Sequence, residues 1–592
     1  KKRGEIREKD KWAVNEIYSC DEEWEREYKE LQEEAPKLKD FEGKLGDAKV
    51  LEEYFEVNEK TSRKAEKIYV YAHLRSDEDT SNTTYQAMMN KIDAYMAEYA
   101  TYTAYVVPEI LALPDGTIEK LMNENKGLEP YKFLIENILK EKPHVLDKKE
   151  EELLAAASDC LDAPSSIHNI MTNADMKFGN IKDEDGEEVE LTEGNYSSFI
   201  KSKDRNVRKA AFERLFGEYK SFENTLATTL SSSIKVFNFG AKIRNYNSAL
   251  EASLKPNDIP TEVYTNAVKT INDNLSSLHR YVKLKKKLLG LEEMHMYDLY
   301  VPVIEVPKEH VEFDKAVEMA VEGLNPLGKE YLDIFQGGIN GGWIDKYINK
   351  GKRGGAYSWG GYDTKPYVLL NYNYELNDVS TLVHEMGHSI HSYYSRKEQS
   401  YYYAGYTLFC AEVASTTNEA LLIHHLINKE TDKKKKLYLI NQELEQIRTT
   451  VFRQLMFAEF ELYTHESFEK GLPLTAQDYN AKWHELNVKY FGPDMVVDSD
   501  IDVEWSRIPH FYSDFYVYQY ATGYAAASAF ANSILNGEKD AVEKYVGFLK
   551  SGGSDYPIEI LKKAGVDMTT SKPLEATINR FNELLDMLEK EI

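Results

Sequence analysis

The chain has 592 residues, of which 42% are hydrophobic and 29% are charged, and its formal net charge is −27 at pH 7. This composition is typical of a globular protein that can bury a large core. Nucleic acids and anionic membranes both require a basic protein surface, so the strong negative charge predicts that neither is a partner.

The three cysteines indicate a reducing compartment. Cys20, Cys160 and Cys410 are far apart in the sequence and form no C-x-x-C pair. Such spacing favours free thiols over a disulfide framework. The sequence shows no secretory signal and no apolar run of membrane-spanning length. Together these features predict a cytoplasmic protein.

The first part of the chain predicts amphipathic helices. Apolar residues recur at three- and four-residue spacing in four segments, Trp24–Ala35, Val50–Leu74, Asn82–Tyr105 and Glu150–Asp159. An Asp-Gly turn at Asp185-Gly186 then predicts a β-hairpin over residues 181–191. We expect an N-terminal helical lobe at residues 1–200 and a second, catalytic domain at residues 201–592.

A β-type segment, Lys365–Asn373, lies between glycine-rich loops and the next helix. Its proline start and asparagine end predict an edge strand. An edge strand can pair with an extended peptide, which would make Tyr367 and Leu369 substrate-binding residues. The alternative is a strand that only closes a small sheet.

The segment from Asp378 to Ser395 predicts a buried helix, capped by Asn377 or Asp378. His384 and His388 are one turn apart, so both imidazoles project from one face and can meet at a single metal ion. Glu385 follows the first histidine, where it can contact a water on the metal without being a ligand. This is the H-E-x-x-H pattern of zinc hydrolases, in which the metal activates water and the glutamate removes its proton.

A third metal ligand has to come from another segment. His391 is a further turn along the same helix, and three ligands on one straight helix cannot converge tetrahedrally, so we expect His391 to pack or to support a ligand. Glu412 lies in an apolar, small-residue run where an unpaired carboxylate would be costly to bury, and a metal offsets that cost. Glu412 is therefore the predicted third ligand. Glu419 either orients one histidine or is an ordinary surface glutamate.

Aromatic residues are dense between Ser506 and Tyr524. Tyr512, Tyr516, Tyr520 and Tyr524 recur every four residues, and His510 and Tyr518 lie among them. Such a stripe is typical of core packing with satisfied hydroxyls. The alternative is that His510 and one or two tyrosines donate hydrogen bonds to the oxyanion formed during hydrolysis.

Three motifs together resemble a known family. They are His384-Glu-Met-Gly-His388-Ser-Ile-His391, Phe409-Cys-Ala-Glu412-Val-Ala-Ser-Thr416, and Arg507-Ile-Pro-His510-Phe-Tyr512 with Phe515-Tyr516-Val-Tyr518. They are similar to the oligoendopeptidase F group of the thimet oligopeptidase-like (M3) zinc metallopeptidase family, and the likeness covers essentially the whole chain.

The resemblance implies a mainly α-helical, two-lobed zincin-type peptidase. It also implies a small β-sheet beside the zinc helix and a deep internal channel that admits short peptides. Its ligands to one zinc ion fall on His384, His388 and Glu412, and its general base falls on Glu385. Its later histidine and tyrosine, which bind substrate and the developing oxyanion, fall on His510 and Tyr518, with Tyr512 and Tyr516 as alternatives.

The sequence thus predicts a zinc endopeptidase that hydrolyses internal bonds of oligopeptides. Two other interpretations stay open at this point. One is an aminopeptidase with the same metal centre, and the other is a non-catalytic helical protein that binds peptides.

Overall fold

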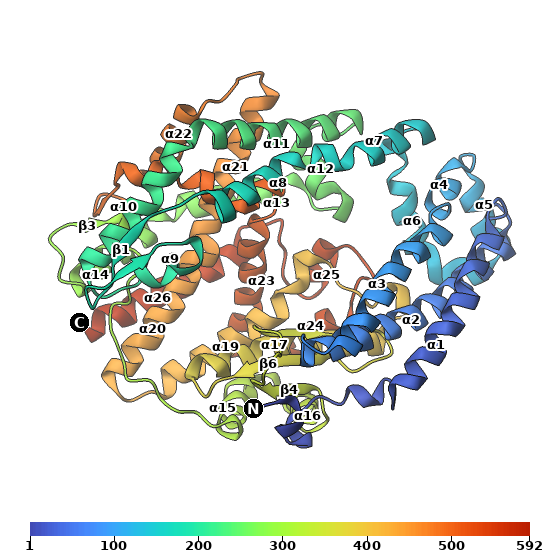
Figure 1. The fold of residues 1–592 in the computed structure, drawn as a ribbon, viewed down its shortest axis with the longest axis horizontal. Helices are drawn as coiled ribbons and strands as arrows, with labels where there is room; N and C mark the ends of the chain where they lie inside the picture. Colours follow the sequence, from blue (N-terminus) through green and yellow to red (C-terminus); the bar gives the residue numbers. More distant parts are fainter. The chain divides into compact units, whose positions relative to one another are not determined.

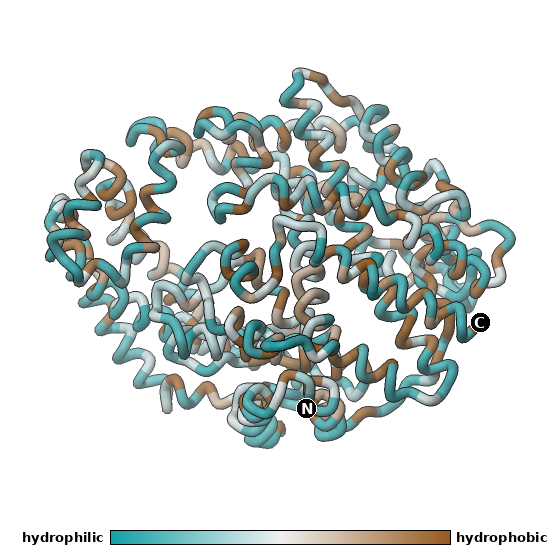
Figure 2. Tube along the Cα trace, turned by 180° about the vertical axis from the view of Figure 1, so that it is seen from behind, coloured by the Kyte–Doolittle hydropathy of each residue, from teal (hydrophilic) through white to brown (hydrophobic).

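The computed structural model describes all 592 residues, and the chain is mainly helical (Figure 1). Polar and apolar residues alternate along the helices (Figure 2), as expected where each helix buries one face. The chain divides into two compact units. Unit 1 comprises Lys1–Pro143, Lys308–His425 and Ser533–Gly565, and unit 2 comprises His144–Pro307, Leu426–Asn532 and Val566–Ile592.

Unit 1 contains helices from three separate stretches of the chain and one small sheet. Its elements are α1 (Asp21–Glu34), α2 (Ala48–Glu78), α3 (Thr83–Thr103), α4 (Val106–Ala112), α5 (Thr117–Glu124), α6 (Lys132–Lys140), α15 (Phe313–Leu324), α16 (Lys329–Asn340), β4 (Ile344–Tyr347), β5 (Tyr357–Trp359), β6 (Tyr367–Tyr372), α17 (Leu376–Glu398), α18 (Leu408–Ala411), α19 (Val413–Lys429), α24 (Ala541–Lys550) and α25 (Pro557–Lys563). The last residues of α19 belong to unit 2.

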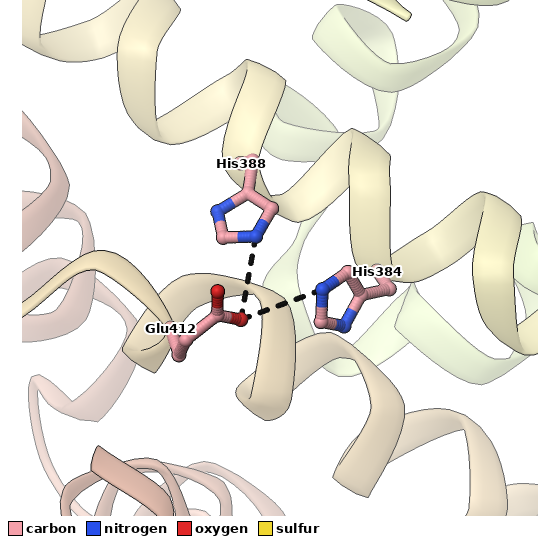
Figure 3. Close-up of side chains that lie close together, drawn as sticks. All are labelled: His384, His388 and Glu412. Carbon is pink, nitrogen blue, oxygen red and sulfur yellow. Dashed lines mark ion pairs between the residues drawn. The ribbon is translucent and has the colours of Figure 1, made fainter. Parts of the chain in front are cut away.

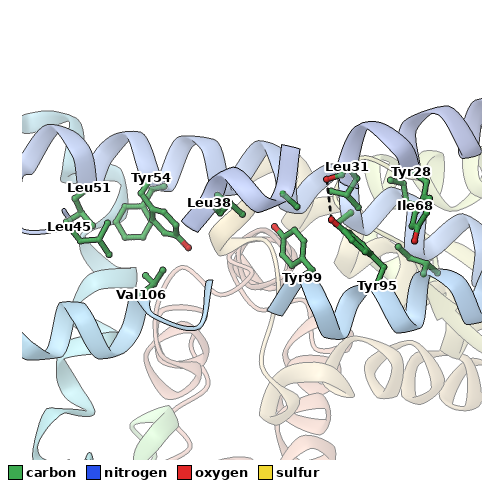
Figure 4. Packing of buried hydrophobic residues seen from close by; sticks show 14 of the residues in the cluster. Tyr28, Leu31, Leu38, Leu45, Leu51, Tyr54, Ile68, Tyr95, Tyr99 and Val106 are labelled. Atoms are coloured by element: carbon green, nitrogen blue, oxygen red, sulfur yellow. Dashed lines mark hydrogen bonds between the residues drawn. The ribbon is translucent and has the colours of Figure 1, made fainter. Parts of the chain in front are cut away.

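The N-terminal helices of unit 1 share a continuous apolar core (Figure 4). Trp24 on α1 is fully buried, stacks on Tyr28 with ring centroids 5.3 Å apart, and donates a hydrogen bond from its indole nitrogen to the Ile68 carbonyl of α2 at 2.9 Å. Tyr95 on α3 donates to the Leu31 carbonyl at 3.4 Å. These are the helices that the apolar periodicity predicted, and each differs from its predicted bounds by only a few residues.

The sheet of unit 1 has three strands in the order β4-β6-β5. β4 runs parallel to β6 and β5 runs antiparallel to it, with Ile344 and Ser358 both opposite Val368. The prediction of an edge strand at Lys365–Asn373 is therefore wrong, because β6 is the central strand and its backbone groups pair on both sides. Strand propensity alone does not reveal how many neighbours a strand has.

Tyr367 and Leu369 of β6 are buried, with 1% and 0% of their surface exposed. They belong to an apolar cluster with Trp12 and Leu74, and the Tyr367 hydroxyl donates to the Ala13 carbonyl at 2.8 Å. Their side chains hold the sheet to α2 and the N-terminal segment. An edge-strand role in binding peptides does not apply to them.

Unit 2 is also mainly helical. Its elements are α7 (Lys148–Leu161), α8 (Ala163–Ile170), β1 (Asn180–Lys182), β2 (Glu188–Glu190), α9 (Glu193–Ile200), α10 (Arg205–Ser221), α11 (Glu223–Ile243), α12 (Ala249–Leu254), α13 (Thr261–Asp273), α14 (Leu275–Leu288), β3 (Met294–His295), α20 (Lys433–Ile447), α21 (Arg453–Glu469), α22 (Ala476–Phe491), β7 (Met495–Val496), α23 (Tyr518–Leu535) and α26 (Lys572–Glu591). The last residues of α23 belong to unit 1.

The predicted hairpin is present as antiparallel β1 and β2, with Ile181 opposite Val189 and Gly186 in the left-handed region at φ +83°. The predicted boundary near residue 200 does not coincide with a boundary between the two units, since the hairpin, α9 and α10 all lie in unit 2. The polar turn at Asp185-Gly186 marks a local change of structure, and α9 and α10 pack together across residue 200.

Trp483 of α22 lies at the centre of an aromatic cluster in unit 2. It is fully buried, and its ring centroid lies 5.2 Å from Phe457, 4.9 Å from Phe460 and 6.0 Å from Phe511. Phe511 belongs to a short 3-10 helix, Pro509–Tyr512, that precedes α23. The core therefore fixes one end of the segment that carries His510.

None of the helices combines the length and hydropathy needed to cross a lipid bilayer. All three cysteines are free thiols, as expected, with Cys20 and Cys160 exposed and Cys410 buried.

Candidate metal centre

The helix that carries the H-E-x-x-H motif, α17, begins four residues after β6 ends. Its first turn is closed by Asp378, whose carboxylate accepts backbone hydrogen bonds from Glu375 at 2.9 Å and Asn373 at 3.1 Å. A carboxylate in the first turn satisfies amide groups that have no partner inside the helix. Asp378 was one of the two predicted capping residues, and it acts from the third helical position with Glu375 as the N-cap.

Helix α17 makes a very close crossing with α19 at Gly387. A Cβ atom at this glycine would lie 2.8 Å from the Ala414 carbonyl oxygen and 2.8 Å from the Ser415 Cα atom. Asn418 of α19 donates a hydrogen bond to the Val383 carbonyl at 2.9 Å, which holds the two helices together. The crossing places the start of α19 against the face of α17 that carries the histidines.

His384, His388 and Glu412 meet at this crossing (Figure 3). Their candidate ligand atoms all lie within 4.8 Å of one another. Glu412 Oε2 lies 3.4 Å from His384 Nε2 and 3.3 Å from His388 Nε2. The structure thus brings together the three side chains that the sequence singled out as metal ligands.

This geometry fits a metal ion that binds nitrogen and oxygen. Tetrahedral zinc ligands at about 2.0–2.1 Å from the ion lie roughly 3.3 Å from one another. The two measured separations from Glu412 Oε2 match that value. Two imidazoles and one carboxylate are a donor set typical of catalytic zinc, and three protein ligands leave a fourth position open.

The residues around the group orient its ligand atoms. The Glu419 carboxylate accepts a hydrogen bond from His384 Nδ1, which directs Nε2 of the same ring towards Glu412. Ser415 donates to Glu412 Oε2 at 2.8 Å. Of the two interpretations of Glu419, the structure supports the one in which it orients a histidine. Hydrogen bonds of this kind fix both the tautomer and the orientation of metal ligands.

The charges of the group favour a cation. Burial lowers the pKa of His384, but the carboxylates of Glu419, Glu412 and Glu385 together raise it to about 9. Burial raises the pKa of Glu412, but the His388 and His384 imidazoles lower it to about 2. The carboxylates therefore stabilise positive charge where the three ligand atoms converge. Glu412 itself is ionised at neutral pH.

Glu385 is buried beside the group, with 8% of its surface exposed. Burial raises the pKa of its carboxyl above the ordinary value, while the two imidazoles act in the opposite direction. A pKa moved towards neutrality suits a residue that accepts and then returns a proton.

Known proteins resemble this chain along its whole length. The profile described as "Peptidase family M3" matches residues 198–580, and the profile described as "Oligopeptidase F" matches residues 109–178. The chain belongs to peptidase family M3. It is a metallopeptidase.

Two bacterial relatives illustrate the similarity. Oligopeptidase PepF of Bacillus subtilis is 48% identical over 99% of this chain and 88% of its own length, and group B oligopeptidase PepB of Streptococcus agalactiae is 42% identical over 99% and 98%. The crystal structure of a candidate peptidase from Chlamydophila abortus matches with a TM-score of 0.96 at 37% identity, covering 100% of both chains.

His391 packs within the peptidase and lies outside the group of three ligands. It is 1% exposed, its ring stacks on Tyr406 with centroids 3.7 Å apart, and Phe548 lies 5.1 Å away. Burial lowers the pKa of His391 to about 3, so the ring is neutral. The packing role expected from its position is confirmed.

The edge of the sheet nearest to the metal group is β5. It pairs with β6 on one side only, and the Ser358 hydroxyl of β5 lies 2.7 Å from the Ser389 hydroxyl of α17. Ser389 directly follows His388 in the sequence. The sequence assigned the edge to the longer and more apolar β6, because β5, with only 3 residues, is too short to show a strand pattern.

The predicted substrate residues between His510 and Tyr518 lie in unit 2. His510 is exposed, and its ring centroid lies 6.0 Å from that of the half-buried Tyr516. Tyr518 is 2% exposed and packs 5.0 Å from Tyr264. Tyr512 packs 4.5 Å from the buried His168. The roles of His510 and the tyrosines in catalysis stay predictions.

Gly387 allows a first prediction. Replacing it with alanine places a methyl group within 3.0 Å of the α19 backbone, so α17 and α19 must separate. We expect Gly387→Ala to destabilise the protein by about 1–3 kcal/mol and to weaken zinc binding, measured by thermal unfolding and zinc titration. Gly337→Ala in α16 is the control, because nothing lies near its added methyl group. Wild-type stability and zinc affinity in Gly387→Ala would contradict this account of the crossing.

Glu419 gives a second prediction. Glu419→Ala leaves His384 Nδ1 without the carboxylate that orients the ring, so zinc affinity should fall about 10–100-fold. Competition with a chelator measures this affinity. Glu398→Ala, at the exposed end of α17, is the control and should bind zinc like the wild type. Equal affinities in all three proteins would show that Glu419 does not support the site.

Proposed function

We propose that this metallopeptidase is a zinc-dependent endopeptidase that hydrolyses internal bonds of short peptides. The observation that carries the proposal is the convergence of His384 Nε2, His388 Nε2 and Glu412 Oε2, with a buried glutamate directly after the first histidine. The names of the relatives describe oligopeptidases and oligoendopeptidases, which supports short peptides as the substrate class.

In this proposal His384, His388 and Glu412 hold one zinc ion. A zinc ion bound there supplies a Lewis acid that makes water more acidic and polarises the carbonyl of the scissile bond. Glu419 and Ser415 keep the ligand atoms of His384 and Glu412 directed at that point. Because only three protein side chains would hold the ion, water and the substrate carbonyl would have room to approach it.

Glu385 moves the proton. Its carboxylate takes a proton from the attacking water as the water oxygen forms a bond to the carbonyl carbon. The same carboxyl then gives the proton to the amide nitrogen as the carbon–nitrogen bond breaks, which releases a new carboxylate and a new amine. The raised pKa of Glu385 suits both halves of this cycle, because the proton must be gained and lost near neutral pH.

His510 and Tyr518 are the proposed donors to the oxyanion that develops on the carbonyl oxygen. The assignment follows from the resemblance of Arg507–Tyr518 to the family motif. Packing against Tyr264 fixes the Tyr518 ring in advance, and a fixed donor stabilises a transition state better than a mobile one. Tyr516, beside His510, is the alternative donor.

The substrate backbone has a natural partner in β5. This strand is an edge of the sheet, and it lies against α17 next to His388. An extended peptide can add to an open sheet edge through main-chain hydrogen bonds, which do not depend on its sequence. This arrangement supports a peptidase that accepts many different sequences.

The direct test of the proposed function uses a short peptide blocked at both termini. The wild-type protein should cleave it internally, a zinc chelator should stop cleavage, and added zinc should restore it. Folded proteins should not be cleaved. Cleavage of only free N-termini would instead indicate an aminopeptidase, and the absence of stoichiometric zinc would contradict the proposal.

Glu385→Gln separates metal binding from catalysis. Glutamine has the size of glutamate but cannot accept the proton, so we expect wild-type zinc content and a loss of turnover of about 10²–10⁴-fold, the range typical of general-base catalysis. Zinc analysis and peptide cleavage are measured on the same preparation. Substantial turnover in Glu385→Gln would rule out the general-base role.

Tyr518→Phe tests the oxyanion donor. Loss of only the hydroxyl should lower kcat by roughly 10²–10³-fold, the usual cost of one oxyanion donor, with a smaller change in KM. Tyr512→Phe and Tyr516→Phe are matched comparisons from the same segment. A large loss in Tyr516→Phe alone would move the role to Tyr516, and small effects in all three variants would remove tyrosine from this step.

A further inference from the structure

The segment that joins His510 to Tyr518 contains a strained residue. Phe515 has φ +51°, in the left-handed region that non-glycine residues rarely adopt. Such a conformation costs free energy and persists only where the surroundings fix it, which occurs often at functional sites. Phe515 is fully buried, so its surroundings can be identified.

Glu461 of α21 contacts this backbone at Phe515 itself. Its Oε2 atom accepts a hydrogen bond from the Phe515 backbone N–H at 2.7 Å. Glu461 is only 2% exposed, and no cation pairs with it. Its second oxygen, Oε1, is buried without a hydrogen-bond partner. A carboxyl group in such a place is costly, so its single hydrogen bond requires an explanation.

Burial raises the pKa of Glu461 well above its ordinary value, although the hydrogen bond from Phe515 lowers it. Burial thus favours the protonated, uncharged form of this carboxyl group. Its function in the fold is to provide an acceptor oxygen, which a neutral amide of the same shape would also provide. Replacing Glu461 with glutamine or with methionine therefore tests whether the segment requires that acceptor oxygen.

Two further residues of α21 act on the segment, one through Tyr264 of α13 and one directly. Ala458, one turn before Glu461, accepts a hydrogen bond from the Tyr264 hydroxyl at 2.6 Å. The Tyr264 ring in turn lies 5.5 Å from Phe515 and 5.0 Å from Tyr518. One turn after Glu461, the buried His465 ring lies 4.6 Å from Phe515.

Helix α21 thus supports the segment by apolar contacts and by one backbone hydrogen bond. The apolar contacts restrict the Phe515 and Tyr518 rings. Two side chains bond to the backbone of the segment: the Glu461 carboxyl accepts from the N–H of Phe515, the residue whose φ is unfavourable, and the Ser253 hydroxyl of α12 donates to the Asp514 carbonyl at 3.1 Å. Of these two bonds, the one to Glu461 acts at the strained residue itself.

We propose that Glu461 is a positioning residue for peptide hydrolysis. By holding the Phe515 N–H it sets the backbone of residues 513–517, and through that backbone it sets the directions of His510 and Tyr518 towards the bound peptide. This inference rests on the proposed function for its catalytic consequence. Its structural part, the order of residues 513–517, does not require any activity.

The experiment compares Glu461→Met with Glu461→Gln. Methionine keeps an unbranched chain of similar length but offers no oxygen, whereas glutamine keeps an acceptor oxygen at the same place. We expect Glu461→Met to lower kcat about 10–100-fold, as small misplacements of active groups do, with KM and zinc content changed less than about threefold. Glu461→Gln should stay within about threefold of wild-type kcat because the hydrogen bond is retained.

Thr577→Val is the matched control. It removes a different, partly buried hydrogen bond of unit 2, from Thr577 Oγ1 on α26 to Ser528 Oγ on α23 at 2.9 Å. A general loss of stability in unit 2 would lower the melting temperature of Thr577→Val and Glu461→Met alike. Only Glu461→Met should lose kcat.

Hydrogen exchange supplies a second readout that is independent of catalysis. Amides of residues 513–517 should exchange faster in Glu461→Met and at the wild-type rate in Glu461→Gln and Thr577→Val. Wild-type kcat and exchange in Glu461→Met would overturn the inference, as would equal losses in the methionine and glutamine variants. If the wild-type protein cleaves no peptide, the proposed function fails, and exchange alone then decides whether Glu461 orders the segment.

Discussion

The close approach of α17 and α19 is the constraint on which the site depends. Two histidines one turn apart direct their imidazoles to one point, but a third ligand must arrive from a second backbone. Gly387 permits that arrival because its missing side chain leaves room for the backbone of Ala414 and Ser415. Any larger residue would separate the start of α19, which directly follows Glu412, from the helix that carries the histidines.

Carboxylates determine the electrostatics of the same place. Glu412, Glu419 and Glu385 raise the pKa of His384 despite its burial, so these carboxylates stabilise a cation at the imidazole pair. The three carboxylates have different roles. Glu412 contacts both imidazoles, Glu419 orients one of them, and Glu385 contacts neither through a hydrogen bond and keeps a raised pKa.

Sequence reasoning succeeded where a function depends on local spacing. The H-E-x-x-H pair is fixed by one helical turn, and the early helices are fixed by apolar periodicity. Glu412 was selected correctly as a neighbour of the histidines, but the argument from burial was inaccurate, because 49% of its side chain is exposed. Non-local features were not predictable. The pairing of β6 on both sides, the helix crossing at Gly387 and the bond from Phe515 to Glu461 all join residues that are distant in sequence.

The central claim is that His384, His388 and Glu412 bind one zinc ion. Anomalous X-ray diffraction at the zinc absorption edge, on crystals of the protein purified without added metal chelators, tests it most directly. The account predicts a single strong peak about 2 Å from His384 Nε2, His388 Nε2 and Glu412 Oε2. A peak elsewhere, or no peak in a protein that cleaves peptides, would contradict it.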